Sequence, residues 1–66
     1  MKVKKVKEII KMLEADGWYL VRHNGTSHRQ FKHPTKSGKT TVNGKPSHDI
    51  TGNLLKSIEK QSGLIF

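Results

Sequence analysis

Cysteine is absent from this 66-residue chain, which excludes disulfides and thiolate metal sites. Long apolar runs are also absent, and none approaches the roughly 18–20 residues that a membrane-spanning helix needs. The N-terminal lysines are not followed by the apolar segment of a signal peptide. The sequence therefore predicts one cytoplasmic domain over residues 1–66 with no membrane partner, near the size at which one core barely suffices.

Acidic residues are scarce, with 5 Asp and Glu against 13 Lys and Arg, and the net charge is +8. Such an excess in a short chain indicates a polyanionic partner, with RNA, DNA or an acidic protein ahead of a membrane surface. The plainer alternative is that the lysines only keep a small protein soluble. Charge alone does not choose between these alternatives.

Two amphipathic helices are predicted near the ends of the chain. Apolar residues at positions i, i+3, i+4 and i+7 indicate a first helix over residues 3–16, ended by Gly17. The second is predicted from a cap at Asp49 or Thr51 to about Ser62, with Ile50 as a possible staple before it. The apolar stripes of the two helices are Val6, Ile9, Ile10, Leu13 and Leu54, Leu55, Ile58.

Three strands are predicted between the helices. Residues 18–23 are rich in aromatic and β-branched residues, residues 24–34 alternate after an Asn-Gly turn signal, and residues 39–43 form a short third strand. The hairpin loop holds two or four residues, depending on whether Thr26 and Ser27 belong to it. Both registers pair even positions of the first strand with odd positions of the second.

The order helix, three strands, helix predicts an α+β fold in which both helices cover one face of a three-stranded antiparallel sheet. This is the architecture of double-stranded-RNA-binding domains, and it leaves the other sheet face open. The core that it predicts consists of the two helical stripes together with Trp18, Leu20, Phe31 and Val42.

His28 is expected on that open face. The strand parity places it with Gln30 and Lys32, and with Tyr19, Val21 and His23 of the first strand. In the four-residue-loop register His23 lies directly opposite His28, which would allow an acid–base pair; the alternative is that His23 is an ordinary hairpin residue.

The remaining histidines have structural explanations. His33 has the opposite parity and precedes a proline, so it is expected to cap the core edge or contact backbone, and His48 is expected to be a loop residue. No two histidines stand at i, i+4 on a helix, and no metal site or cofactor is expected.

A histidine among cations suits RNA cleavage, because RNA carries its own nucleophile in the 2′-hydroxyl. The enzyme must move protons and stabilise negative charge on the phosphate, which imidazole and basic side chains do. His28 is therefore the candidate catalytic residue, and Tyr19 is a candidate for stacking on a base. The candidate RNA-phosphate contacts are Lys32, Arg29, Arg22, Lys36 and Lys39.

The sequence resembles the HicA-type toxins of bacterial HicA/HicB toxin–antitoxin systems, which are small mRNA interferases. The residues that carry the resemblance are the run Ser27-His28-Arg29-Gln30-Phe31-Lys32-His33-Pro34, the pair Gly17-Trp18, Val42 and the closing segment 56–64. The resemblance implies a double-stranded-RNA-binding-like fold, metal-independent cleavage of mRNA with His28 as the essential histidine, inhibition of translation, and neutralisation by a HicB-type antitoxin. The chain has Thr26-Ser27-His28 where the family usually has Gly-Ser-His.

Three other functions remain open. The chain could be a non-catalytic double-stranded-RNA-binding module of the same fold, which would need the basic face and no histidine. It could be an interaction subunit whose charge meets an acidic protein. Non-specific DNA binding is the third, and intact DNA beside cleaved RNA would distinguish it from the nuclease.

Overall fold

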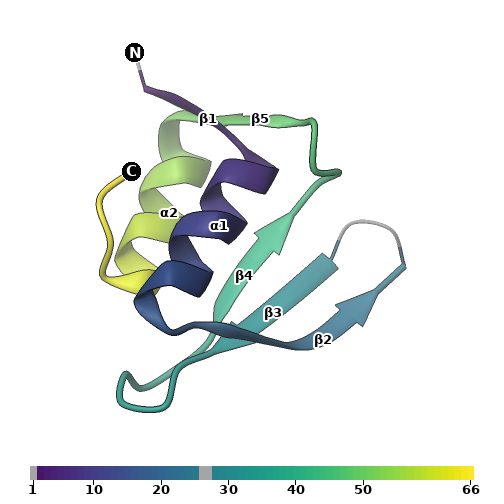
Figure 1. The fold of residues 1–66 in the computed structure, drawn as a ribbon. Helices are drawn as coiled ribbons and strands as arrows, with labels where there is room; N and C mark the ends of the chain where they lie inside the picture. The colour runs from purple at the N-terminus through teal and green to yellow at the C-terminus, as the bar shows by residue number, and fades with distance from the viewer. Residues whose placement is uncertain (1, 26–27) are drawn as a thin grey trace.

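The computed structural model describes residues 2–25 and 28–66 (Figure 1). Thr26 and Ser27, on which the predicted length of the hairpin loop depends, lie outside the described residues. The elements in chain order are β1 (Val3–Lys5), α1 (Val6–Asp16), β2 (Tyr19–Asn24), β3 (His28–Lys32), β4 (Thr40–Asn43), β5 (Asp49–Thr51) and α2 (Gly52–Ser62).

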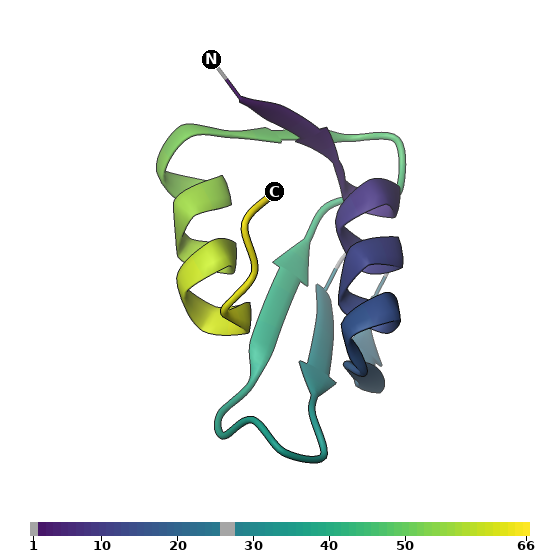
Figure 2. The ribbon, with the colours of Figure 1, turned by 60° about the vertical axis from the view of Figure 1, so that its left-hand side comes forward.

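The main sheet is antiparallel and has the strand order β2-β3-β4. Both helices lie on the same face of it (Figure 2), and buried apolar side chains of α1, α2 and the sheet pack together as the core. The predicted fold class, helix, three antiparallel strands and helix, is thus confirmed. The short strands β1 and β5 pair with each other in a separate sheet that the sequence did not predict, and β1 was wrongly included in the first helix.

The core lies between the two helices and the covered face of the sheet. Its aromatic centre is Trp18 and Phe31, each at most 2% exposed, and burying each such side chain contributes roughly 1.5–3 kcal/mol. Leu20 and Leu54, predicted as core, are 47% and 53% exposed, so these two predictions are wrong. The other buried apolar residues are Val6, Ile9, Leu13, Val42, Ile50, Leu55, Ile58 and Phe66.

The first turn of α1 is capped by a distant segment. The backbone N–H groups of Val6 and Lys7 donate to the carbonyls of His48 (2.9 Å) and Pro46 (3.1 Å). The Glu8 carboxylate accepts the Lys5 N–H at 3.2 Å. The loop between β4 and β5 thus satisfies helix donors that would otherwise need water or a capping side chain.

The last turn of α1 requires a glycine. Gly17 has a φ of +106°, and the N–H groups of Gly17 and Trp18 return to the carbonyls of Glu14 and Leu13, as in the usual glycine-ended helix. A Cβ on Gly17 would lie 2.9 Å from Nε2 of His33. The chain therefore turns from helix to strand where only glycine fits.

Among the described residues, no helix is long and apolar enough to cross a membrane.

Candidate active site on the open face of the sheet

The sheet has one covered face and one open face. Phe31, Thr40 and Val42 are at most 1% exposed and point towards the helices. Alternate residues of β3 and β4 therefore point the other way. His28 is the first residue of β3 and is exposed. The alternation thus places it on the open face, as expected from the sequence.

Two asparagines flank His28 across the strands. It pairs with Asn24 of β2 on one side and with Asn43 of β4 on the other. Directly paired residues have Cβ atoms about 4.5–5.5 Å apart and share a sheet face. His28 therefore stands in the middle of a row of three polar side chains. No local pattern predicts this row, because only the strand register brings the two asparagines beside the histidine.

A β-bulge sets the position of Arg22. The register of β2 against β3 shifts between Leu20 and Arg22, so Val21 is an extra residue in the strand and the parity of β2 changes beyond it. Arg22 pairs with Gln30 and reaches the open face, and its Nε donates to Oδ1 of Asn24 at 3.4 Å. The alternation of a regular strand, expected from the sequence, would place Arg22 on the covered face with Leu20 and is wrong at this position.

The same bulge separates the two hairpin histidines. His23 pairs with Arg29, on the strand face opposite to that of His28. The alternative in which a four-residue loop pairs His23 with His28 is therefore wrong, and so is the acid–base pair that it would allow. The even-to-odd pairing that the sequence predicted holds only before the bulge, at Tyr19 with Lys32 and Leu20 with Phe31.

Tyr19 and Lys32 extend the open face at its other end. They pair directly, and both are exposed. Lys32 is four residues along β3 from His28, which corresponds to about 13 Å. The structure therefore brings His28, Arg22, Lys32 and Tyr19 together on one face, over a length that suits several nucleotides of a single strand.

The other candidate cations lie elsewhere. Arg29 is on the covered face, and its guanidinium donates to the carbonyl of Gly44 at 2.8 Å. The Lys36 ammonium donates to Asp16 Oδ2 at 2.6 Å and to the carbonyl of Ser62 at 3.1 Å, which ties α1 to the end of α2. Lys39 is exposed in the loop before β4.

His33 is a structural residue, as the sequence indicated. Its Nδ1 accepts the backbone N–H groups of Thr35 (3.1 Å) and Lys36 (3.2 Å). Nε2 must therefore carry the proton, which it donates to the carbonyl of Asp16 at 2.6 Å. The ring also packs edge-on against Trp18, with ring centroids 5.2 Å apart. Both ring nitrogens are thus occupied within the protein.

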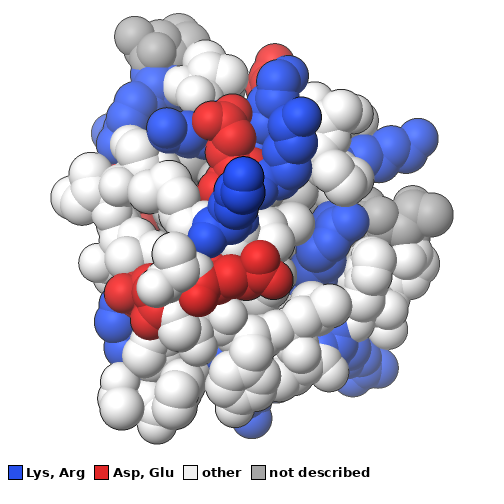
Figure 3. All heavy atoms as spheres, viewed as in Figure 1, with Lys and Arg blue, Asp and Glu red and all other residues white. Residues whose placement is uncertain are grey.

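Charge is distributed unevenly over the molecule. Residues 17–48 contain six Lys and Arg, all four histidines and no Asp or Glu. Acidic and basic side chains lie together over α1, whereas the region of β2 and β3 shows basic groups without acidic ones on the same face (Figure 3). A polyanion is therefore attracted to the hairpin side of the molecule.

Three of the five acidic residues, Asp16, Asp49 and Glu59, form ion pairs with lysines. The hydrogen bond from Lys36 holds the pKa of Asp16 below its usual value, and the positive charge of Lys36 adds to this. The hydrogen bond from Lys2 lowers the pKa of Glu59 in the same way, helped by the N–H of Phe66. Both carboxylates therefore stabilise the helical side of the molecule.

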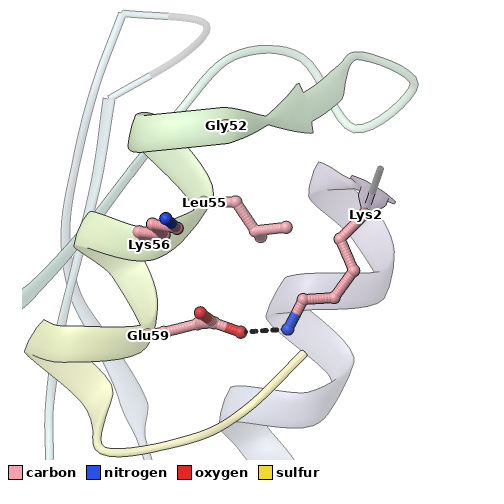
Figure 4. A pocket seen from close by; sticks show the side chains of 5 residues that line it. All are labelled: Lys2, Gly52, Leu55, Lys56 and Glu59. Atoms are coloured by element: carbon pink, nitrogen blue, oxygen red, sulfur yellow. Dashed lines mark hydrogen bonds and ion pairs between the residues drawn. The ribbon is translucent and has the colours of Figure 1, made fainter.

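A hollow near the start of α2 has no catalytic chemistry. It is lined by Lys2, Gly52, Leu55, Lys56 and Glu59 (Figure 4). The Lys2 ammonium and the Glu59 carboxylate pair at 2.6 Å and neutralise each other. Among the residues that the structure describes, no histidine or hydroxyl lines it, so the open sheet face is the stronger candidate site.

Comparison with models of known protein families identifies the family of this chain. Residues 6–64 match the model of the HicA toxin of bacterial toxin–antitoxin systems. The chain belongs to the HicA toxin family. The match covers every element from α1 to α2, and a search of curated proteins finds no match. This HicA family member is therefore a toxin of a toxin–antitoxin system, and an antitoxin is its implied partner.

Proposed function

We propose that this chain is a metal-independent endoribonuclease that cleaves mRNA, inhibits translation and is neutralised by a HicB-type antitoxin. The observation that supports the proposal is the exposed His28 on the open face, in register between Asn24 and Asn43 and within a region that has no acidic residue. The family assignment supports the same activity.

His28 acts on protons in this proposal. Its imidazole takes the proton of a ribose 2′-hydroxyl, or delivers one to the leaving 5′-oxygen, because histidine is the side chain that titrates near neutrality. The 2′-oxygen attacks the adjacent phosphorus, the bond to the 5′-oxygen breaks, and a 2′,3′-cyclic phosphate forms. The reaction needs no external nucleophile.

The side chains around His28 hold the phosphate and the bases. The guanidinium of Arg22 stabilises the negative charge that builds on the phosphate oxygens. Lys32 contacts the next phosphates along the strand, and Tyr19 stacks on a base. Lys39 contributes general attraction from the loop before β4. The guanidinium of Arg29 and the ammonium of Lys36 already hold protein carbonyls, so we assign them a smaller part.

The test is an RNA cleavage assay in a chelating buffer. We expect His28→Ala to lower the cleavage rate at least about 100-fold, the usual contribution of a general acid or base. His23→Ala is the matched control, because His23 lies on the opposite face of the same hairpin, and it is expected to retain activity.

Two results would contradict the proposal. Equal cleavage by wild type and His28→Ala would remove His28 from the reaction. RNA binding without cleavage by the wild type would favour the alternative, a non-catalytic double-stranded-RNA-binding module.

A further inference from the structure

The edge of β2 differs from every other part of the main sheet. All six residues of β2 are exposed. Tyr19, Leu20 and Val21 are 50%, 47% and 44% exposed, and they are consecutive. Edge strands usually carry charges or are covered, because an apolar edge offers a template for another strand. This edge has neither protection along those three residues.

The opposite edge of the same sheet is closed. The backbone N–H of Thr41 in β4 donates to Oε1 of Gln61 in α2 at 2.9 Å. The Gln61 amide is itself held by its donation to Ser57 Oγ at 3.1 Å. The second helix therefore occupies a hydrogen-bonding position at the β4 edge that an added strand would need.

The same hydrogen bond defines which groups of β2 are free. The Thr41 N–H points away from β3, so Thr41 and Gln30, which are opposite each other, form a non-hydrogen-bonded pair. The N–H and C=O of Gln30 therefore point to the other neighbouring strand, β2. There Gln30 meets Arg22. The alternation of an antiparallel ladder then directs the N–H and C=O of the next residue, His23, to the free edge. The N–H and C=O of Leu20 also point to the free edge, because the backbone N–H and C=O of Phe31, the residue opposite it, point to β4. In the described part of the chain no other element bonds to these groups.

We propose that an extended acidic segment of the antitoxin adds to β2 as a fourth strand. Main-chain bonds at Leu20 and His23 would supply the pairing, and the exposed apolar side chains would supply contact area. The absence of acidic residues from 17–48 selects an acidic protein segment. A second copy of this chain is disfavoured, because two molecules of charge +8 would meet through their basic hairpins.

This position also explains inhibition. A strand added to β2 lies two strand spacings, or about 10 Å, from the strand that carries His28. Its acidic side chains on the open face would stand beside Arg22 and Asn24 and oppose the approach of RNA. The inference rests on the proposed neutralisation by an antitoxin and specifies where it acts.

The first test compares His23→Pro with His23→Ala. Proline removes the N–H that faces the free edge and leaves the ladder bonds of Arg22 and Asn24 to β3 in place. The antitoxin probe is the protein encoded beside this chain's gene, purified in complex with it. We expect His23→Pro to weaken binding at least about tenfold and His23→Ala less than about threefold. Equal affinities of two folded variants would overturn the proposal.

The second test uses the unmodified chain, so it does not depend on the folding of a variant. The amides of Leu20 and His23 should exchange hydrogen rapidly in the free chain and at least about tenfold more slowly in the complex. Those of Arg22 and Asn24 should be slow in both. Unchanged exchange at Leu20 and His23 would overturn the proposal.

Two further measurements separate the alternatives. A free chain that sediments as a dimer, and that His23→Pro converts to a monomer, would show that a second copy is the occupant and would overturn the proposal. RNA cleavage by free His23→Pro should stay within about twofold of wild type. Failure of the wild type to cleave RNA would refute the nuclease while the exchange data still supported docking on β2.

Discussion

Two histidines in neighbouring regions of this molecule show how environment separates structure from function. His33, whose side chain is 9% exposed, has both ring nitrogens bonded to backbone and packs on Trp18. His28, five residues earlier on the same hairpin arm, is exposed between two asparagines. One imidazole holds the helix, the sheet and a loop together, and the other is the candidate for proton transfer in the proposed reaction. Identical side chains five residues apart therefore lie in different environments, and under the proposed function their roles are separable.

The largest expected effects come from replacing each of the two histidines by alanine and measuring both stability and RNA cleavage. His33→Ala leaves the N–H groups of Thr35 and Lys36 without their acceptor and is expected to lower the free energy of unfolding by about 2–3 kcal/mol, with cleavage per folded molecule retained. His28→Ala should change stability by less than about 0.5 kcal/mol and abolish cleavage. Urea unfolding and RNA cleavage of both variants measure the two effects. A loss of activity in folded His33→Ala would contradict the separation.

The next largest effect is expected from a substitution at Gly17, which lies next to the His33 ring at the end of α1. Gly17→Ala forces a side chain into a φ of +106° and places a Cβ 2.9 Å from the His33 ring, so we expect a loss of about 2 kcal/mol or more. Gly38→Ala is the control, because its φ is +82° but no atom lies within 4 Å of the added Cβ, and it should lose only about 1 kcal/mol. Thermal unfolding would show the difference. Equal losses would mean that the contact with His33 has no part.

Alanine substitutions of the two hairpin arginines, Arg22 and Arg29, test the difference between the open and the covered face of the sheet. Arg22→Ala should weaken RNA binding about three- to tenfold and reduce the slope of log affinity against log salt by about 0.7, the value for one phosphate contact on a single strand. Arg29→Ala should instead lower stability by about 1–2 kcal/mol, because it leaves the Gly44 carbonyl unpaired. RNA titrations at several salt concentrations distinguish them. The reverse pattern would mean that the bulge does not turn Arg22 to the open face.

The smallest effect concerns acid pH. Lys36 lowers the folded-state pKa of Asp16 below the unfolded value of about 3.9. The ion pair therefore stabilises the fold fully above about pH 5, and this contribution is lost as the pH falls through the folded pKa. Lys36→Met should lose less stability than wild type between pH 5 and pH 3, as urea midpoints would show. If the urea midpoints of wild type and Lys36→Met fell by the same amount between pH 5 and pH 3, the ion pair would be excluded as a contributor to stability.

Local patterns in the sequence predicted the helices and the core strands well. The stripe of Val6, Ile9 and Leu13 corresponds to the buried face of α1, because helical periodicity depends only on near neighbours. The alternation around Phe31 correctly placed His28 on the open face. Leu54 fits the stripe of α2 equally well, yet it lies in the first turn of the helix and is 53% exposed.

Features that depend on distant partners were not predictable from local patterns. β1 exists because Lys4 pairs with Ile50, a contact between residues 46 positions apart in sequence. The bulge at Val21 has no local signature, since Val suits a regular strand as well. It nevertheless reverses the faces of Arg22 and His23, so one extra residue changed which side chains accompany His28.

The sequence by itself determined the fold class, the family and the basic character, and it indicated His28 as the candidate catalytic residue, because periodicity, charge and motif are properties of neighbouring residues. Only the tertiary structure decided that Arg22, Asn24 and Asn43 surround His28, that His33 and Lys36 are held by the protein, and that no other described strand pairs with the outer edge of β2. These follow from strand register and from long-range hydrogen bonds, which exist only once segments far apart in the chain have packed together.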